Sequence, residues 1–255
     1  MGFYYMGFYT LIEREFYRFM RLSRQTILPP LITTVMFILI FGYSLGTRIK
    51  EISGFPYIIY ILPGLIQMAV ITNAYANSST SLYMARLERS IENMLVAPLT
   101  HFQMVTAYMI GGLLRGMVVA GVITAVSAFF IDFPFHHWGL IFTSIFFTSI
   151  LFSGFGIISA LYAESWDKIA MFTNFVITPF VYLGGVFYSI KMLPPFWHKI
   201  SLANPMFYCV DLVRYSFLGV SDAPVWIGLT VVVSAAVILY GVCIYLFWRG
   251  YKLVN

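Results

Sequence analysis

Long uncharged stretches alternate with short charged segments along the whole chain. A membrane-spanning helix needs about 20 mostly apolar residues to cross about 30 Å of hydrocarbon. Six segments meet that length, and one of them carries a single arginine at its centre. We therefore predict an all-α integral membrane protein, with one transmembrane domain over residues 1–255. The predicted spans are residues 27–46, 57–81, 103–130, 138–162, 168–190 and 225–248.

A short amphipathic helix is predicted before the first span, over residues 8–24. Its apolar positions include Leu11, Phe16 and Phe19. Helices of this type lie in the plane of the membrane interface. The pattern leaves two interpretations open, a plain membrane anchor or a surface for a partner protein. The predicted water-facing side comprises Glu13, Arg14, Glu15, Arg18 and Arg21.

A second amphipathic helix is predicted between the second and third spans, over residues 83–97. Leu87, Ile91, Met94 and Leu95 recur at the spacing of one helical face. Pro98 restricts the residue before it and so ends the helix. This helix either binds a partner protein or lies passively in the lipid headgroups. Its predicted polar face comprises Arg86, Glu88, Arg89 and Glu92.

Residues 194–218, before the last span, are too apolar for a solvated loop and too interrupted for another span. Pro195 can start a short helix, the Asn204-Pro205 pair breaks it, and Gly219 stops a second helix. At 1.5 Å per residue, neither piece crosses a bilayer. We predict two re-entrant helices whose broken backbone is shielded by protein or water.

Several polar side chains fall inside the predicted spans. Arg115 lies mid-span, where a cation costs roughly 2.5–3.5 kcal/mol on insertion scales. It therefore needs either a structural partner or a hydrated path. Asn73 and Asn77 should face a bundle or a wet cavity, for helix-to-helix hydrogen bonds or for transport. Small residues that would let another helix approach recur at Gly112, Gly116, Ala120, Thr124 and Ala128.

The composition agrees with a membrane protein. Only 10% of the residues are charged and the mean hydropathy is +0.86, whereas soluble domains carry about 25% charged residues. Lysine and arginine are more frequent on the side that holds both termini, which predicts that both ends are cytoplasmic. The net charge of +5 then reflects this asymmetry and anionic lipid, and it requires no nucleic-acid partner.

The sequence offers little catalytic chemistry. It has no Gly-x-x-x-x-Gly-Lys-Ser/Thr run to hold the phosphates of ATP. All ten acidic residues are predicted in loops or at span ends, which disfavours an ion-coupled secondary transporter or channel without excluding either. Cys209 and Cys243 are predicted too far apart to form a disulfide. The histidines are too scattered for a metal or catalytic set: His101, His136, His137 and His198.

Residues 86–98 resemble the cytoplasmic loop of ABC-2 type permeases, the membrane subunits of ATP-binding cassette exporters. Segments 63–66, 71–77, 178–189, 193–197 and 214–219 agree with the same family in the same order. The resemblance implies a homodimer in the bacterial inner membrane, in contact with membrane lipid, with two copies of a cytosolic ATP-binding cassette subunit. It implies export of an amphipathic, lipid-linked, polysaccharide or drug-like substrate. ATP and Mg would be bound by the partner subunit, and this chain would bind no cofactor and perform no catalysis.

Together with the resemblance, the patterns give three groups of candidate residues. The second amphipathic helix would act as the coupling helix, and the outer re-entrant helices would close the path to the outside. The expected contacts with the ATP-binding subunit are Arg86, Glu88, Arg89 and Glu92, together with Glu13, Arg14 and Arg18 of the interface helix. The expected transport path includes Arg115, Asn73 and Asn77, and the expected outer gate comprises Phe196, Trp197, Tyr208 and Arg214.

Overall fold

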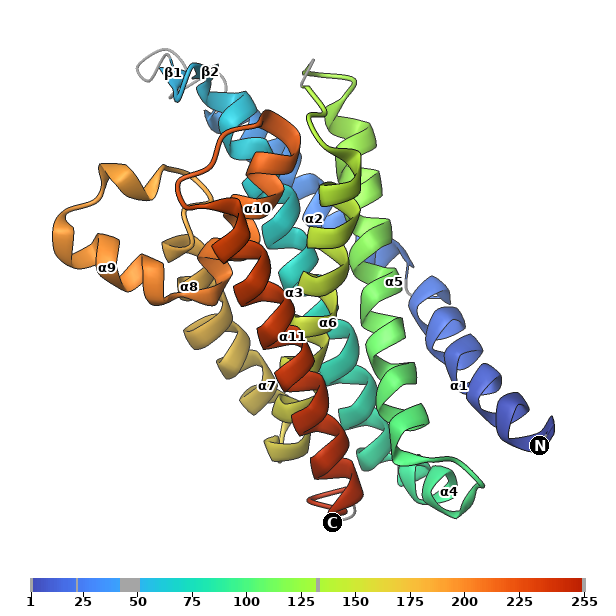
Figure 1. The fold of residues 1–255 in the computed structure, drawn as a ribbon. Helices are drawn as coiled ribbons and strands as arrows, with labels where there is room; N and C mark the ends of the chain where they lie inside the picture. Colours follow the sequence, from blue (N-terminus) through green and yellow to red (C-terminus); the bar gives the residue numbers. More distant parts are fainter. Residues whose placement is uncertain (1, 22, 42–50, 132–133, 254–255) are drawn as a thin grey trace.

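The computed structural model describes residues 2–21, 23–41, 51–131 and 134–253. Helices dominate these residues and pack into one elongated bundle (Figure 1). One short hairpin joins β1 (Glu51–Ile52) to β2 (Phe55–Pro56). The long helices are α1 (Gly2–Arg21), α2 (Ser23–Leu39), α3 (Tyr57–Leu87), α5 (His101–Ser127), α6 (Trp138–Tyr162) and α11 (Val225–Trp248).

Helix α3 forms the centre of the bundle. It packs most extensively against α6 and α5, and 78% of its most apolar 18-residue window is buried. Helix α11 packs mainly on α6 and buries only 22% of the corresponding window. An apolar helix that exposes most of its surface needs an apolar solvent. The outer position of α11 is therefore consistent with contact to lipid.

Small residues bring α5 close to its neighbours, as the sequence predicted for Gly112 and Gly116. A Cβ atom at Gly112 would overlap Ser153 Oγ, and one at Gly116 would lie 2.6 Å from Ser149 Oγ. Toward the end of α5, Thr124 and the following C-cap residue Ala128 instead line a cavity of about 280 Å³ beside Trp138. Only the first half of the predicted small-residue stripe therefore serves a close helix contact.

The described residues support four or five of the six predicted spans. Four described helices, α3, α5, α6 and α11, are long and apolar enough to cross a membrane. Helices α1 and α2 are bent by 59° at their junction and would form a fifth span if taken together. The all-α membrane class holds, whereas six spans are not reached among the described residues.

The first predicted span, residues 27–46, is placed differently in the structure. Helix α2 begins at Ser23 and ends at Leu39, and residues 42–46 of the prediction lie outside the described residues. Pro29 and Pro30 lie inside the helix and do not open it. Membrane helices tolerate internal proline when neighbouring groups satisfy the freed backbone.

The fifth predicted span, residues 168–190, is neither regular nor complete. It consists of α7 (Trp166–Phe172), the π-helical segment η2 (Thr173–Ile177) and α8 (Thr178–Leu183). The chain leaves the helix at Gly184–Gly185, where Gly185 takes φ +78°, a conformation that favours glycine. The predicted end at residue 190 was therefore wrong, because the Gly-Gly turn stops the helix.

The connection between α6 and α7 is short. Ser165 caps α7 by accepting a hydrogen bond from the Lys168 backbone N–H at 3.4 Å. The Lys168 side chain hydrogen-bonds to Glu164, and this bond lowers the pKa of the Glu164 carboxyl. A connection of this length holds α6 and α7 next to each other.

Two short helices precede α11, as predicted: α9 (Pro195–Ala203) and α10 (Pro205–Leu218). Asn204 separates them and caps α10 by accepting a hydrogen bond from the Met206 N–H. Gly219 ends α10 with φ +75°. Helix α10 is buried against α3, α6 and α11, whereas α9 projects to the side of the bundle (Figure 1).

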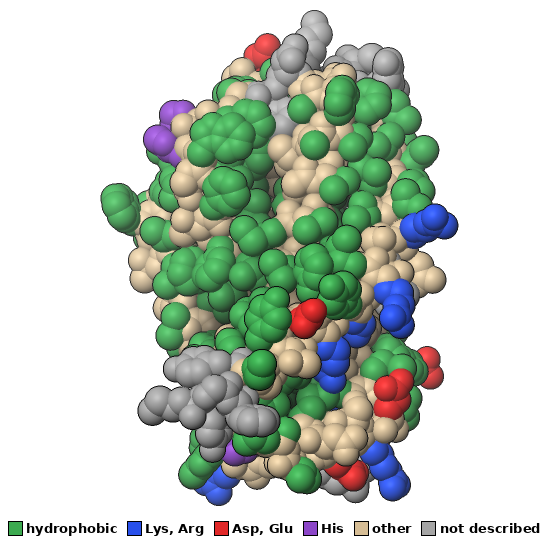
Figure 2. Space-filling model, turned by 90° about the vertical axis from the view of Figure 1, so that its right-hand side faces the viewer, with side chains coloured by type: hydrophobic (Ala, Val, Ile, Leu, Met, Phe, Trp, Pro, Cys, Tyr) green, Lys and Arg blue, Asp and Glu red, His purple; other side chains and the backbone are tan. Residues whose placement is uncertain are grey.

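The two ends of the bundle differ in what they present. The N-terminus, the C-terminus and α4 (Ser90–Val96) lie at the lower end in Figure 1, and the β hairpin lies at the upper end. One face is largely covered by hydrophobic side chains, and charged side chains gather toward its lower half (Figure 2). Both cysteines are free and buried, so the prediction that Cys209 and Cys243 do not pair is confirmed.

Candidate functional site

The second amphipathic segment, predicted as one helix over residues 83–97, is two helices. Helix α3 continues to Leu87, the chain turns at Glu88 and Arg89, and α4 begins at Ser90. Arg89 adopts a left-handed conformation with φ 55°, which ordinary helices do not contain. The sequence periodicity could not reveal this turn because charged residues occupy it.

The turn changes which side chains of the segment are exposed. Ile91 and Met94 of α4 are buried, as the periodicity predicted, but Leu87 and Leu95 are exposed. Leu87 belongs to α3 and is out of phase with α4, because a helical face does not continue through the turn. Glu88, Arg89 and Glu92 are exposed and lie on the outer surface of the turn and of α4.

Arg86 does not belong to that exposed surface, contrary to the prediction. It is buried near the end of α3, and its Nη1 atom donates to the carbonyls of Ala160 at 2.6 Å, Leu161 at 3.3 Å and Ala163 at 3.3 Å. These carbonyls lie at the C-terminus of α6, where the last four have no intrahelical partner and favour a cation. Arg86 therefore ties the end of α6 to α3.

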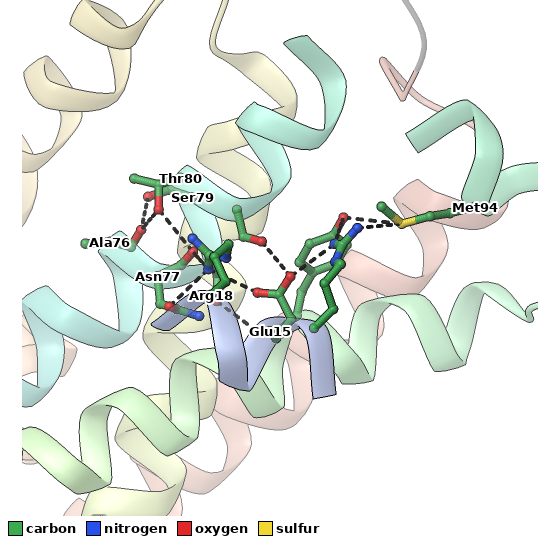
Figure 3. A network of polar contacts seen from close by, with 11 residues as sticks. Glu15, Arg18, Ala76, Asn77, Ser79, Thr80 and Met94 are labelled. Carbon is green, nitrogen blue, oxygen red and sulfur yellow. Dashed lines mark hydrogen bonds and ion pairs between the residues drawn. The ribbon is translucent and has the colours of Figure 1, made fainter. Parts of the chain in front are cut away.

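Glu15 of α1 lies on the buried side of the helix and not, as predicted from the sequence, on the water-facing side. The predicted water-facing side contained Glu15, but this side chain is fully buried, in line with Leu11 and Phe19. Figure 3 shows Glu15 and Arg18 pointing from α1 toward Asn77 on α3. The spacing of Leu11, Glu15 and Phe19, four residues apart, is the signal that could have placed Glu15 on the buried face.

The Glu15 carboxylate is the centre of a polar network. It accepts hydrogen bonds from Arg14 Nη2 at 3.1 Å, Arg18 Nη2 at 3.0 Å and Ser81 Oγ at 2.7 Å. Arg18 Nη2 also donates to Asn77 Oδ1 at 3.0 Å. All but one residue of this set were expected on the membrane surface or along the transport path. The network instead fixes α1 to α3.

The same network reaches α4. Arg14 donates to the Tyr108 hydroxyl at 3.4 Å, and both side chains approach the sulfur of Met94, at 3.8 Å for Arg14 and 3.7 Å for Tyr108 (Figure 3). Met94 belongs to α4 and Tyr108 to α5. A displacement of α4 would therefore act directly on α1 and α5. The contact between Met94 and Tyr108 was not predicted, since nothing in the sequence pattern pairs these two residues.

A groove of about 570 Å³ opens beside this network at the lower end of the bundle. It is bounded by α1, by the last turns of α3 and by the start of α4. Arg14, Arg18 and Arg21 contribute three cations to its wall, and Glu88 contributes one carboxylate. Glu13, also predicted on this surface, is partly buried and does not line the groove. The groove therefore presents mostly positive charge.

Two of the three residues predicted along a transport path meet in a second cavity. Arg115 Nε donates to Asn73 Oδ1 at 3.1 Å, and both residues line a cavity of about 340 Å³ between α2, α3 and α5. Asn77 does not line it, because its amide oxygen is held by Arg18. The structure thus joins Arg115 to Asn73 and assigns Asn77 to the Glu15 network.

The four predicted gate residues do not form one group. Phe196 and Trp197 are exposed on α9, at 69% and 46%. Tyr208 donates to the Leu202 carbonyl at 2.8 Å. Arg214 is buried, donates to the Gly185 carbonyl at 2.5 Å and lies 4.2 Å from the centre of the Tyr60 ring.

Near the predicted gate, two carboxylates that the sequence analysis did not single out hold the loop before α11. Asp211 accepts hydrogen bonds from the backbone N–H groups of Asp222 and Ala223, at 2.9 and 3.1 Å. Asp222 in turn accepts from Ser189 Oγ and the Ile190 N–H. Within the described part of the chain, no group of three His, Cys, Asp or Glu side chains is placed to hold a metal ion.

Comparison with known proteins gives consistent matches over most of the chain. The model of the ABC-2 type transporter family matches residues 6–218. The chain is 41% identical over 250 residues to the inner membrane transport permease YadH of Escherichia coli K12, covering 98% of each protein. It is 23% identical over 211 residues to nodulation protein J of Neorhizobium galegae, covering 81% of this chain and 79% of that protein. The match to nodulation protein J of Rhizobium leguminosarum bv. viciae is 24% over 212 residues, covering 81% of this chain and 80% of that protein.

Proposed function

The chain belongs to the ABC-2 type transporter family, and from that premise we propose that it is the membrane subunit of an exporter driven by a separate ATP-binding subunit. As a member of this family it is a multi-pass inner membrane protein and a permease of an ABC transporter, which implies an ATP-binding cassette partner. It is a transport subunit without catalysis of its own.

The contact between α4 and the rest of the bundle is the main support for this proposal. Glu88, Arg89 and Glu92 are exposed at the lower end, and the buried side of α4 contacts the Arg14–Tyr108 pair through Met94. The ATP-binding subunit would dock on α4 and on the adjoining groove. Its closure on ATP and Mg, both bound by the partner, would displace α4 and thereby α1 and α5.

We place both termini and α4 on the cytoplasmic side, and two permease chains with two ATP-binding subunits in the complex. The distribution of lysine and arginine supports this orientation. The transported molecule would be amphipathic, such as a lipid-linked, polysaccharide or drug-like compound, and would move outward. Arg86 is left out of the docking surface because it is buried.

An ion-coupled secondary transporter is less well supported. Coupling requires a carboxylate that can exchange its proton or ion. The Glu15 carboxylate is occupied by two arginines and a serine, and Asp211 is occupied by two backbone N–H groups. Neither is free to bind a coupling ion without breaking these contacts.

The proposal is tested by purifying the tagged chain from membranes that contain its ATP-binding partner and measuring co-purification and ATP hydrolysis. Glu92→Arg should reduce both, because a reversed charge at a docking surface costs about 2–5 kcal/mol when that charge is desolvated. Glu51→Arg, an exposed carboxylate at the opposite end, is the matched control. Unchanged co-purification for Glu92→Arg and for an Arg89→Glu variant would make α4 a passive interfacial helix.

A further inference from the structure

The cavity that contains Arg115 has the size and walls of a ligand site. We name it the Arg115 cavity; at about 340 Å³, it falls within the range of small-molecule pockets. Its polar lining residues include Gln25, Thr26 and Thr33, and its apolar ones include Phe37, Leu65 and Met68. A pocket lined by both kinds of side chain suits an amphipathic molecule.

Arg115 supplies a positive charge halfway along the bundle. It lies near the middle of α5, about 21 Å along the helix axis from His101. Among the described residues, no carboxylate lies within ion-pair distance of its guanidinium. A cation at this depth is costly unless an anion or water accompanies it.

Asn73 leaves most of the Arg115 guanidinium available in the cavity. The Asn73 amide holds only Nε of Arg115, at 3.1 Å, and no described residue accepts a hydrogen bond from the two terminal nitrogens. The carboxylate of the adjoining network, Glu15, is already shared by Arg14 and Arg18 and does not line the cavity. Among the described residues that line the cavity, Arg115 is the one charged side chain.

We propose that the Arg115 cavity binds an anionic amphipath, with its phosphate or carboxylate group on Arg115 and its apolar part along Phe37, Leu65 and Met68. The planar guanidinium can donate two parallel hydrogen bonds to either group. This assignment rests on the proposed function, because it names the class of molecule that the permease would accept. It distinguishes that class from neutral and cationic amphipaths.

The test uses the full chain purified in a neutral detergent and dodecyl phosphate as the probe, with binding measured by calorimetry. The unmodified chain should bind it saturably. Arg115→Gln should raise the dissociation constant about ten-fold or more, as for the loss of a charge-assisted hydrogen bond. The dissociation constant of Arg115→Lys should lie between those of the unmodified chain and Arg115→Gln, because lysine keeps the charge but loses the planar pair of hydrogen-bond donors. Arg249→Gln, at an exposed arginine after α11, should leave binding unchanged.

Competitors separate the sources of binding. Dodecanol, which has the same chain without the charge, should compete weakly, and inorganic phosphate should compete only at much higher concentration. Equal competition by dodecanol, or equal affinity of Arg115→Gln, would overturn the assignment. Equal affinity for inorganic phosphate would also overturn it and indicate a site for a free anion.

A second variant guards against misfolding of Arg115→Gln. Thr33→Tyr reduces the cavity from its exposed side and leaves Arg115 in place. It should also weaken binding of dodecyl phosphate, and unaltered binding would contradict the assignment. Calorimetry requires neither ATP nor a partner. Absence of dodecyl phosphate binding would therefore reject the ligand assignment alone, whereas the Glu92 experiment tests docking of the ATP-binding subunit.

Discussion

Glu15 is the side chain on which the attachment of α1 to the bundle depends most. Its carboxylate has no exposed surface and joins two arginines of α1 to Ser81 of α3. Arg14 and Arg18 keep 40% and 26% of their side-chain surface exposed. The network is therefore buried on its acidic side and open to solvent on its basic side.

We predict that Glu15→Gln destabilises the chain and loosens α1. The change removes the charge between two arginines, and breaking a fully buried ion pair costs about 3–5 kcal/mol. Because the arginines retain contact with solvent, we expect a smaller loss of about 2 kcal/mol. The readout is a lower melting temperature in detergent and faster proteolysis before α2. Glu51→Gln, at an exposed carboxylate, should change neither. Equal stability of the two variants would show that the network contributes little.

For single residues, the sequence predicted which side chains are unusual for a membrane span better than it predicted which side chains are buried. The mid-span position of Arg115 and the polar character of Asn73 follow from hydropathy alone, and the structure joins the two. Arg86 and Glu15 were expected in water because charged residues usually are. Their burial depends on partners distant in the sequence, Ala160 and Ser81, which no local pattern reveals.

At the scale of elements, the close packing of α5 against its neighbours depends on glycine, which has no side chain. Gly112 lies against Ser153 on α6 and Ser78 on α3, whereas a Cβ atom added to Gly121 on the same helix would meet no neighbouring atom within 4 Å. The two glycines thus form a matched pair on one helix. One is required by packing and the other is not.

Gly112→Ala should therefore destabilise the chain by about 1–3 kcal/mol, the usual cost of overpacking a core. Gly121→Ala should be neutral or stabilising by up to about 1 kcal/mol, because alanine favours the helix. Thermal unfolding of both variants in the same detergent provides the comparison. Equal melting temperatures would contradict the close contact between α5 and α6.

Element ends were predicted where a local signal marks them. Asn204-Pro205 and Gly219 marked the limits of α10 in the sequence. The break between α3 and α4 was missed because Arg89 takes its left-handed conformation without a glycine. The π-helical segment and the end at Leu183 were missed as well, since hydropathy continues through both.

At the scale of the whole molecule, the proposed orientation makes opposite ends of the bundle accessible from opposite sides of the membrane. A cysteine replacing Lys199, exposed on α9, should react with an impermeant thiol reagent in intact cells whose outer membrane is open to it. A cysteine replacing Glu92 should react only after the inner membrane is permeabilised. Cys209 and Cys243 are buried, so labelling of the unmodified chain should be low. The reverse pattern would invert the orientation.

The proposed function requires that a separate ATP-binding subunit docks on α4. Asn93 is exposed on that helix, next to Glu92, and offers a position for a photo-crosslinking residue. On illumination of membranes that contain both subunits, a crosslinker at Asn93 should capture the ATP-binding subunit, and one at Lys199 should not. Absence of the adduct from Asn93, or the same adduct from Lys199, would contradict docking of the ATP-binding subunit on α4.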